Sequence, residues 1–166
     1  GVAHNPESNM KLASGIAPIQ QMLDAGIRVA LGTDGASSNN NLDMLEEMRS
    51  ASYLQKVHLM NPTAIPAYQA MQMATINGAI ALGLGNETGQ LKPGYKADMI
   101  IMSFKQPHML PAYDPIANIV YAAQASDVET VIVDGNILMQ DRIIKAFDEK
   151  EVLAKARETA QRLVGR

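Results

Sequence analysis

The sequence of 166 residues contains no cysteine. Disulfide bonds and thiolate metal sites are therefore excluded, and we expect a cytoplasmic protein. No apolar run approaches the roughly 18 residues that a membrane-spanning helix needs. An excess of positive charge is lacking too, since the net charge is −3 and the pI is about 5.6. This balance argues against a general affinity for nucleic acid or for an anionic membrane.

Motifs that would complete a site within the chain are also missing. The histidines form neither an HxH nor an HExxH pair, so their spacing predicts no complete metal site. The GTDG run at residues 32–35 lacks the lysine and the glycine spacing of a phosphate-binding loop. We expect His58 to stabilise a helix C-terminus and His108, in a proline-rich loop, to face solvent.

The residues that are present indicate a soluble α/β protein, with 47% hydrophobic and 19% charged residues. Hydrophobic periodicity in the first sixty residues predicts two successive strand–loop–helix units, which imply a parallel sheet. The expected elements are a strand end at 1–3, a loop at 4–6, a helix at 16–24, a strand at 27–31 and a helix at 42–59. Residues Leu42, Leu45, Met48 and Ser52 are expected to share one face of the last helix.

A different pattern follows in the second half of the chain. A further helix is expected at 67–82, and a strand at 99–102. The Asp134–Gly135 pair between two apolar runs predicts a hairpin with a type I′ turn, whose strands are 130–133 and 136–139. Asp148 and Glu151 have the spacing of a capping box at the start of a last helix. We therefore divide the chain at 1–84, 85–147 and 148–166.

Asp34 is the first candidate for a functional residue, because it follows the apolar run Val29–Leu31 and stands between Gly32 and Gly35. Chemistry in α/β proteins gathers at the carboxyl ends of parallel strands. Asp34 is therefore either a functional carboxylate or an Asx-turn or N-cap residue. His4 follows the preceding strand. It either forms a hydrogen bond with a nearby backbone group or lines the same site as Asp34 at the strand ends.

Three stretches resemble known enzymes. "HNPESNMKLASGIAPIQQMLDAGIRVALGTDGASSNNNLDM" is similar to the region of the seventh and eighth barrel strands in amidohydrolase-superfamily deaminases. The group that it resembles most is that of the 5-methylthioadenosine/S-adenosylhomocysteine deaminases, with the related chlorohydrolases. "GQLKPGYKADMIIMSF" and "VETVIVDGNILMQD" resemble the C-terminal segments that fold into a small β-sandwich in this family.

The resemblance implies the C-terminal part of a metal-dependent (β/α)₈ TIM barrel, strands 7–8, with part of a composite β-sandwich. Such enzymes hydrolyse C–N bonds and commonly remove ammonia from a purine ring. One divalent metal, commonly zinc, is held by an HxH pair, a further histidine and an aspartate after strand eight. Only the aspartate maps onto this sequence, at Asp34, where it would bind the metal and accept a proton from the attacking water. His4 is the candidate for the substrate pocket.

The resemblance also implies that the remaining ligands lie on a missing N-terminal part of the same polypeptide. We expect the chain alone to be inactive and to bury its open sheet edges by self-association. Three explanations for the missing barrel strands are open. The chain is a shortened form of the protein, a domain that packs on a second copy, or a remnant that docks onto its missing half. Guanine, triazine or chlorohydrolase-type substrates are the alternatives to an adenosine-type nucleoside. A structural or interaction domain without catalysis is the alternative of another class.

Overall fold

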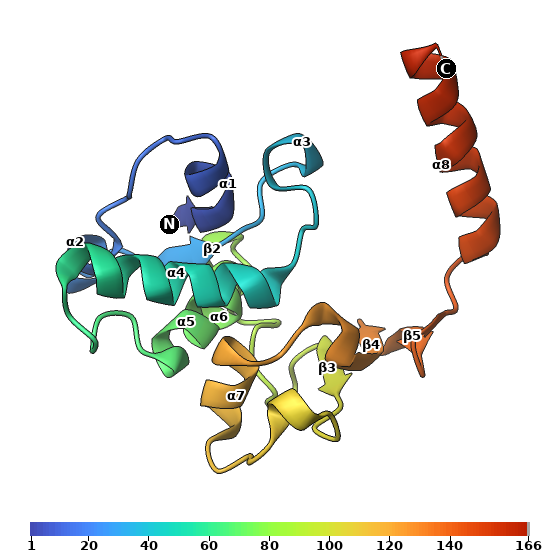
Figure 1. Ribbon diagram of the computed structural model, residues 1–166. Helices are drawn as coiled ribbons and strands as arrows, with labels where there is room; N and C mark the ends of the chain where they lie inside the picture. The colour runs from blue at the N-terminus through green and yellow to red at the C-terminus, as the bar shows by residue number, and fades with distance from the viewer. Residues whose placement is uncertain (166) are drawn as a thin grey trace.

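The computed structural model describes residues 1–165 of the chain (Figure 1). Its elements are, in order, β1 (Val2–His4), α1 (Pro6–Lys11), α2 (Ile19–Asp24), β2 (Val29–Leu31), α3 (Ala36–Asn39), α4 (Met44–Leu59), α5 (Ala67–Ala74), α6 (Ile76–Ala81), β3 (Met99–Met102), η1 (Pro107–Met109), α7 (Pro115–Tyr121), η2 (Ala125–Asp127), β4 (Val128–Val133), β5 (Asn136–Gln140), β6 (Ile143–Ile144) and α8 (Glu149–Val164). The predicted α/β class is confirmed. No helix within the described residues is both long and apolar enough to cross a membrane.

Strands β1 and β2 form the predicted parallel pair, in a register that sets His4 beside Leu31. All three residues of β2 are buried, so this strand lies at the centre of its helical surroundings. Helices α2, α4, α5 and α6 contact β2. Both strands end at the same edge of the sheet because they are parallel, and the turns that follow them lie together there.

The turns after both strands are more helical than predicted. His4 is the last residue of β1 rather than part of a loop, and α1 begins at Pro6, in the first-turn position where proline is tolerated. A second short helix, α3, occupies part of the expected loop after β2. Helix α2 begins at Ile19 rather than at residue 16, because Pro18 has left the helical conformation and stands at the N-cap.

Helix α4 begins at Met44, where the Asp43 side chain accepts hydrogen bonds from the backbone N–H groups of Leu45 and Glu46. Leu45, Met48 and Ser52 are buried as predicted. The placement of Leu42 on the same face is wrong. Leu42 precedes the helix with a φ of 55° and is 45% exposed, because the chain turns sharply before the N-cap.

Residues 67–82 are helical as predicted, but the prediction of one continuous helix is wrong. The helix is broken at Thr75 into α5 and α6. Thr75 has a φ of −124° and a ψ of −95°, outside the helical region. The break re-aims α6, so that the buried Asn77 side chain donates to the carbonyl oxygen of Val29 at 2.9 Å. A carbonyl group at the centre of the fold is thereby satisfied.

The second half contains an antiparallel sheet in the order β3-β4-β5-β6. The predicted strand at 99–102 and the hairpin are confirmed, and positive φ angles at Asp134 and Gly135 (50° and 78°) fit the type I′ turn. Segment 85–147 also contains α7, which was not predicted and which packs against α4 and α5. Arg49 of α4 donates to the carbonyl oxygens of Val120 and Ala123 and so joins the two halves.

Helix α8 extends away from the rest of the molecule (Figure 1), and none of its described residues is buried. Asp148 caps it as predicted, by accepting from the N–H groups of Lys150 and Glu151. The reciprocal half of the predicted capping box is not formed, since the Glu151 carboxylate accepts from Lys155 instead. Arg166, the last residue of predicted segment 148–166, lies outside the described residues.

Candidate active site at the strand ends

Asp34 lies three residues beyond β2, at the edge of the sheet where His4 ends β1. The backbone N–H of Gly32 donates to the carbonyl oxygen of His4 at 3.0 Å and keeps the two strand ends together. A Cβ at Gly32 would lie 2.6 Å from Oδ1 of Asn5, so a larger residue here would require the Asn5 side chain to move.

The carboxylate of Asp34 is held by two hydroxyl groups from different elements. Ser8 of α1 and Ser38 of α3 both donate to Oδ2, at 2.8 and 2.7 Å. These hydrogen bonds, that of Ser38 first, together with the Gly35 backbone, hold the pKa of Asp34 below its ordinary value. The side chain is exposed, and both serine hydroxyls go to Oδ2 while neither goes to Oδ1, so a ligand can approach Oδ1 without displacing a hydroxyl.

The backbone of Asp34 is unusual as well, with a φ of 58° in the left-handed region. Aspartate tolerates this region better than most residues, but the conformation persists only where its surroundings enforce it. The N-cap interpretation of Asp34 is wrong, because Gly35 is the N-cap of α3 and no side chain caps that helix. The carboxylate is directed to the serine hydroxyls instead.

His4 is buried, with 3% of its surface exposed, and its Nε2 has no hydrogen-bond partner among residues 1–165. Burial lowers the pKa of its imidazole to about 4, so the ring is neutral near pH 7. Its place as the last residue of β1 corrects the predicted position in the loop. Its role in a substrate pocket stays a prediction.

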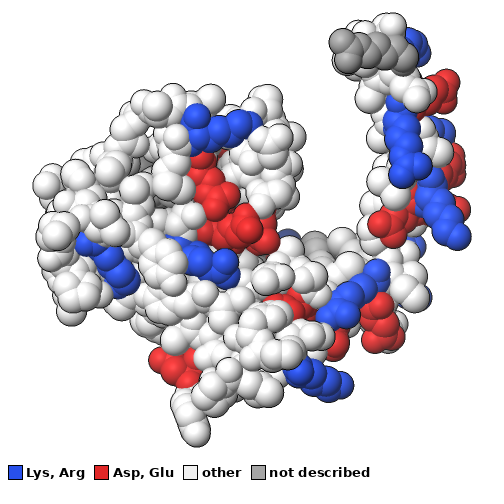
Figure 2. Space-filling model, viewed as in Figure 1, with Lys and Arg blue, Asp and Glu red and all other residues white. Residues whose placement is uncertain are grey.

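The acidic groups around Asp34 form a continuous surface. Figure 2 shows acidic side chains gathered in the hollow between α1, α3 and α4, with basic side chains above them. Lys11 at the end of α1 spans this hollow and donates to Ser37 O at 2.9 Å and to the side chain of Asn40. The two short helices are therefore linked at the rim as well as at Asp34.

Three residues of this arrangement were missed by the sequence analysis, namely Ser8, Ser38 and Glu47. Ser8 lies 26 residues from Asp34 and has no local signal, whereas Ser38 lies only four residues after Asp34. Glu47 carried a signal, because it stands three residues after Met44 and four before Ala51, at apolar helical spacing. The structure buries this carboxylate completely.

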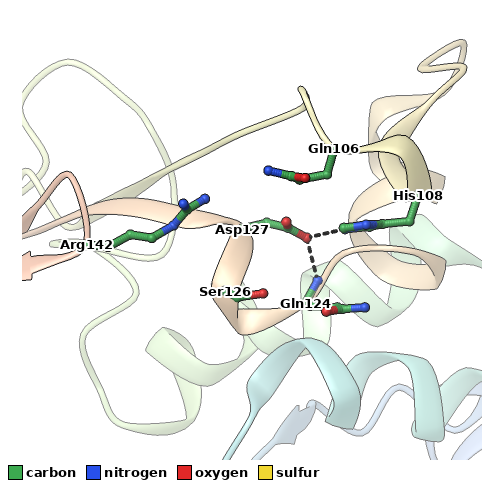
Figure 3. Close-up of a pocket in the computed structure, with 6 residues that line it drawn as sticks. All are labelled: Gln106, His108, Gln124, Ser126, Asp127 and Arg142. Atoms are coloured by element: carbon green, nitrogen blue, oxygen red, sulfur yellow. Dashed lines mark hydrogen bonds and ion pairs between the residues drawn. The ribbon is translucent and has the colours of Figure 1, made fainter.

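A second polar cluster lies far from Asp34 in sequence. Gln106, His108, Gln124, Ser126, Asp127 and Arg142 line an open hollow of about 360 Å³ (Figure 3). His108 is exposed, as predicted, and its Nε2 also lies 2.8 Å from Oδ2 of the buried Asp127, a contact that the sequence did not indicate. The N–H of Gln124 donates to the same oxygen at 2.9 Å. His58 is exposed as well and lies in the last turn of α4, at the helix C-terminus where it was expected.

Residues 1–138 match the model of the Amidohydrolase family, and the chain belongs to this family. It is 72% identical over 166 residues to the 5-methylthioadenosine/S-adenosylhomocysteine deaminase of Syntrophomonas wolfei. It is 56% identical over 165 residues to the 5′-deoxyadenosine deaminase of Methanosarcina mazei. The chain spans all or nearly all of its own length in these matches but only 38% of the length of either relative.

Solved structures give the same picture. An adenosine deaminase from Xanthomonas campestris with bound zinc superimposes with a TM-score of 0.96 and 34% identity, over 99% of this chain and 38% of that one. The zinc-complexed atrazine chlorohydrolase from Arthrobacter aurescens gives a TM-score of 0.87 and 26% identity, over 95% of this chain and 35% of that one. The predicted resemblance to amidohydrolase deaminases is thereby confirmed.

Proposed function

We propose that this chain is the C-terminal part of a metal-dependent deaminase that acts on an adenosine-type nucleoside such as 5-methylthioadenosine. The names of the relatives that are 56–72% identical support this substrate class over the triazine and chlorohydrolase alternatives, whose structural neighbour is 26% identical. In the same proposal, β1 and β2 are the seventh and eighth strands of a (β/α)₈ barrel. The cytoplasm is the proposed location.

The observation that carries the proposal is the carboxylate of Asp34 at the carboxyl end of β2. Its Oδ2 is fixed by two serine hydroxyls, its Oδ1 receives neither, and its lowered pKa keeps it ionised near pH 7. An exposed, ionised and oriented carboxylate fits a divalent metal such as zinc. Within residues 1–165 no three His, Asp or Glu side chains gather as a metal site, so Asp34 supplies one ligand and the others come from outside the chain.

The bound metal would supply a water molecule whose pKa is lowered toward 7. Asp34 would hold the metal and would be the group that takes up the proton of this water when its oxygen replaces the amino group on the ring carbon. The amino group then leaves as ammonia after it has received a proton, and the ring retains a carbonyl oxygen. The buried and neutral His4 would line the substrate pocket beside Asp34, and its Nε2 has no hydrogen-bond partner among residues 1–165.

Substitution of Asp34 in the longer protein tests this role. Asp34→Asn keeps the shape of the side chain but removes the negative charge and the proton acceptor, so the release of ammonia from 5-methylthioadenosine should fall by at least about 100-fold. Asp24→Asn, at an exposed carboxylate that ends α2, is the matched control and should retain full activity. More than about a tenth of the activity in Asp34→Asn would overturn the assignment.

The length of the polypeptide can be tested independently of activity. The coding region upstream of Gly1, together with the intact mass of the natural protein, should show a preceding segment that bears an HxH pair. If the mature protein begins at Gly1, the interpretation as a structural or interaction domain would be favoured.

A further inference from the structure

Glu47 is a carboxylate that the proposed mechanism does not use, although α4 buries it with none of its surface exposed. Its two oxygens accept from different elements. The Asn39 side-chain amide of α3 donates to Oε1 at 2.5 Å, and the backbone N–H of Glu7 in α1 donates to Oε2 at 3.2 Å. Burial of a carboxyl group is costly unless such donors compensate for the lost hydration, and here it raises the pKa of Glu47 to about 7.

The two donors to Glu47 are the direct neighbours of the two residues that hold Asp34. Glu7 precedes Ser8 in α1, and Asn39 follows Ser38 in α3. One buried carboxylate on α4 therefore fixes both of the short helices whose hydroxyls meet at Oδ2 of Asp34. Two further hydrogen bonds hold the residues that donate to Glu47. Ser50 of α4 donates to the Glu7 side chain at 2.8 Å, and the N–H of Leu42 donates to the Asn39 side chain at 2.9 Å.

Helices α1 and α3 need such external support. They contain six and four residues, which is far below the length at which a helix is stable by itself. The segments on both sides of α3 also contain left-handed backbone, with positive φ angles at Asp34 before the helix and at Asn40 and Leu42 after it. Conformations of this kind are kept only when the surrounding contacts enforce them.

We propose that Glu47 is a positioning residue, which holds α1 and α3 at the separation that lets Ser8 and Ser38 orient the carboxylate of Asp34 with Oδ1 free. This inference rests on the proposed function of Asp34. Glu47 acts through Asn39 and Glu7 and touches neither metal nor substrate.

The test uses Glu47→Gln in the longer protein. Glutamine keeps the size of the side chain but replaces one carboxyl oxygen by an NH₂ group. This group cannot accept a hydrogen bond, so either Asn39 or the Glu7 N–H loses its acceptor. The zinc dissociation constant of the metal-free protein should rise about 10- to 100-fold, the range that is typical of groups supporting metal ligands. At saturating zinc, kcat for 5-methylthioadenosine should fall in the same range while KM changes less than about threefold.

The matched control is Glu46→Gln. Glu46 is the adjacent carboxylate in α4 and accepts from Asn41, not from α1 or from an α3 residue. The change in side-chain chemistry is the same but the contacts to α1 and α3 are kept, so zinc affinity and kcat should stay within about twofold of the unchanged protein.

A combination of substitutions separates positioning from simple stabilisation. Ser8→Ala with Ser38→Ala removes the hydroxyls through which Glu47 would act, so adding Glu47→Gln to this pair should weaken zinc binding less than about twofold further. Additive losses would overturn the inference, as would a Glu47→Gln protein with unchanged zinc affinity and a lowered unfolding temperature only. If Glu47→Gln does not fold, Asn39→Ala decides the question by the same zinc titration, and unchanged affinity there overturns the inference.

The proposed function itself is monitored by Asp34→Asn in the same series. If Asp34→Asn keeps both zinc affinity and turnover, the role of Asp34 is wrong. If Asp34→Asn loses both while Glu47→Gln and Asn39→Ala lose neither, only the positioning role of Glu47 is wrong.

Discussion

His108 and Asp127, 19 residues apart in the chain, form a hydrogen-bonded pair in which Nε2 lies 2.8 Å from Oδ2. The Asp127 side chain is 2% exposed, whereas that of His108 is 35% exposed. Burial alone would raise the pKa of Asp127, but the bond from His108 and that from the Gln124 N–H hold it below its ordinary value. His108 therefore compensates a charge that the fold has taken out of water.

Removing this partner should destabilise the protein. His108→Ala leaves the buried carboxylate with one donor fewer, at a cost of about 1 to 3 kcal/mol in the free energy of unfolding. Urea denaturation at pH 7 measures this loss. His58→Ala, at an exposed position in α4, is the control and should change the free energy by less than about 1 kcal/mol. Equal effects of the two substitutions would contradict a special role for the His108–Asp127 pair.

Stability should depend on pH through His4. Its pKa is about 4 in the folded protein and 6.5 ordinarily, so between these values the unfolded chain binds more protons. The contribution is complete above pH 6.5 and is lost as the pH falls to about 4, for a total of about 3 kcal/mol. The raised pKa of Glu47 gives a slope of opposite sign over much of this range, so the contribution of His4 is measured as a difference. Urea denaturation of the metal-free protein and of His4→Gln between pH 4 and 7 should show stabilities that diverge by this amount. A slope that His4→Gln leaves unchanged would assign the pH dependence to other groups.

The chain of 166 residues alone should bind zinc weakly. One carboxylate, Asp34, competes poorly with water, because protein zinc sites normally offer three or more ligands. Equilibrium dialysis followed by metal analysis is the direct measurement. One tightly bound zinc per monomer would mean that the described residues contain a site that their arrangement does not reveal.

Self-association is expected for the same isolated chain. Helix α8 exposes apolar residues along its length, with Val152 at 47% and Leu163 at 78%, and β3 presents an unpaired edge of the four-stranded sheet. Such surfaces and edges favour pairing with a second copy. Sedimentation velocity at low micromolar concentration should show dimers or larger species. Val152→Lys with Leu163→Lys should shift the distribution towards monomer, and a monomeric unsubstituted chain would contradict the expectation.

Local chemistry let the sequence predict a large part of the fold. The hairpin turn follows from Asp134–Gly135, because both residues tolerate positive φ, and the start of α8 follows from the capping side chain of Asp148. The apolar run Val29–Leu31 predicted a buried strand, and Asp34 at its end was identified as the candidate carboxylate. Each of these features depends on residues a few positions apart, so a single stretch of sequence contains the necessary information.

Tertiary structure decided the features that join distant residues. The helix is broken at Thr75, and Asn77 just beyond the break donates to the carbonyl of Val29, 48 residues away in the chain. The serine hydroxyls at Asp34 and the burial of Glu47 depend on how α1, α3 and α4 pack at the strand ends. A local pattern does not specify which buried polar groups will meet, because their partners are set by the packing of whole elements and by the need to satisfy every buried donor and acceptor.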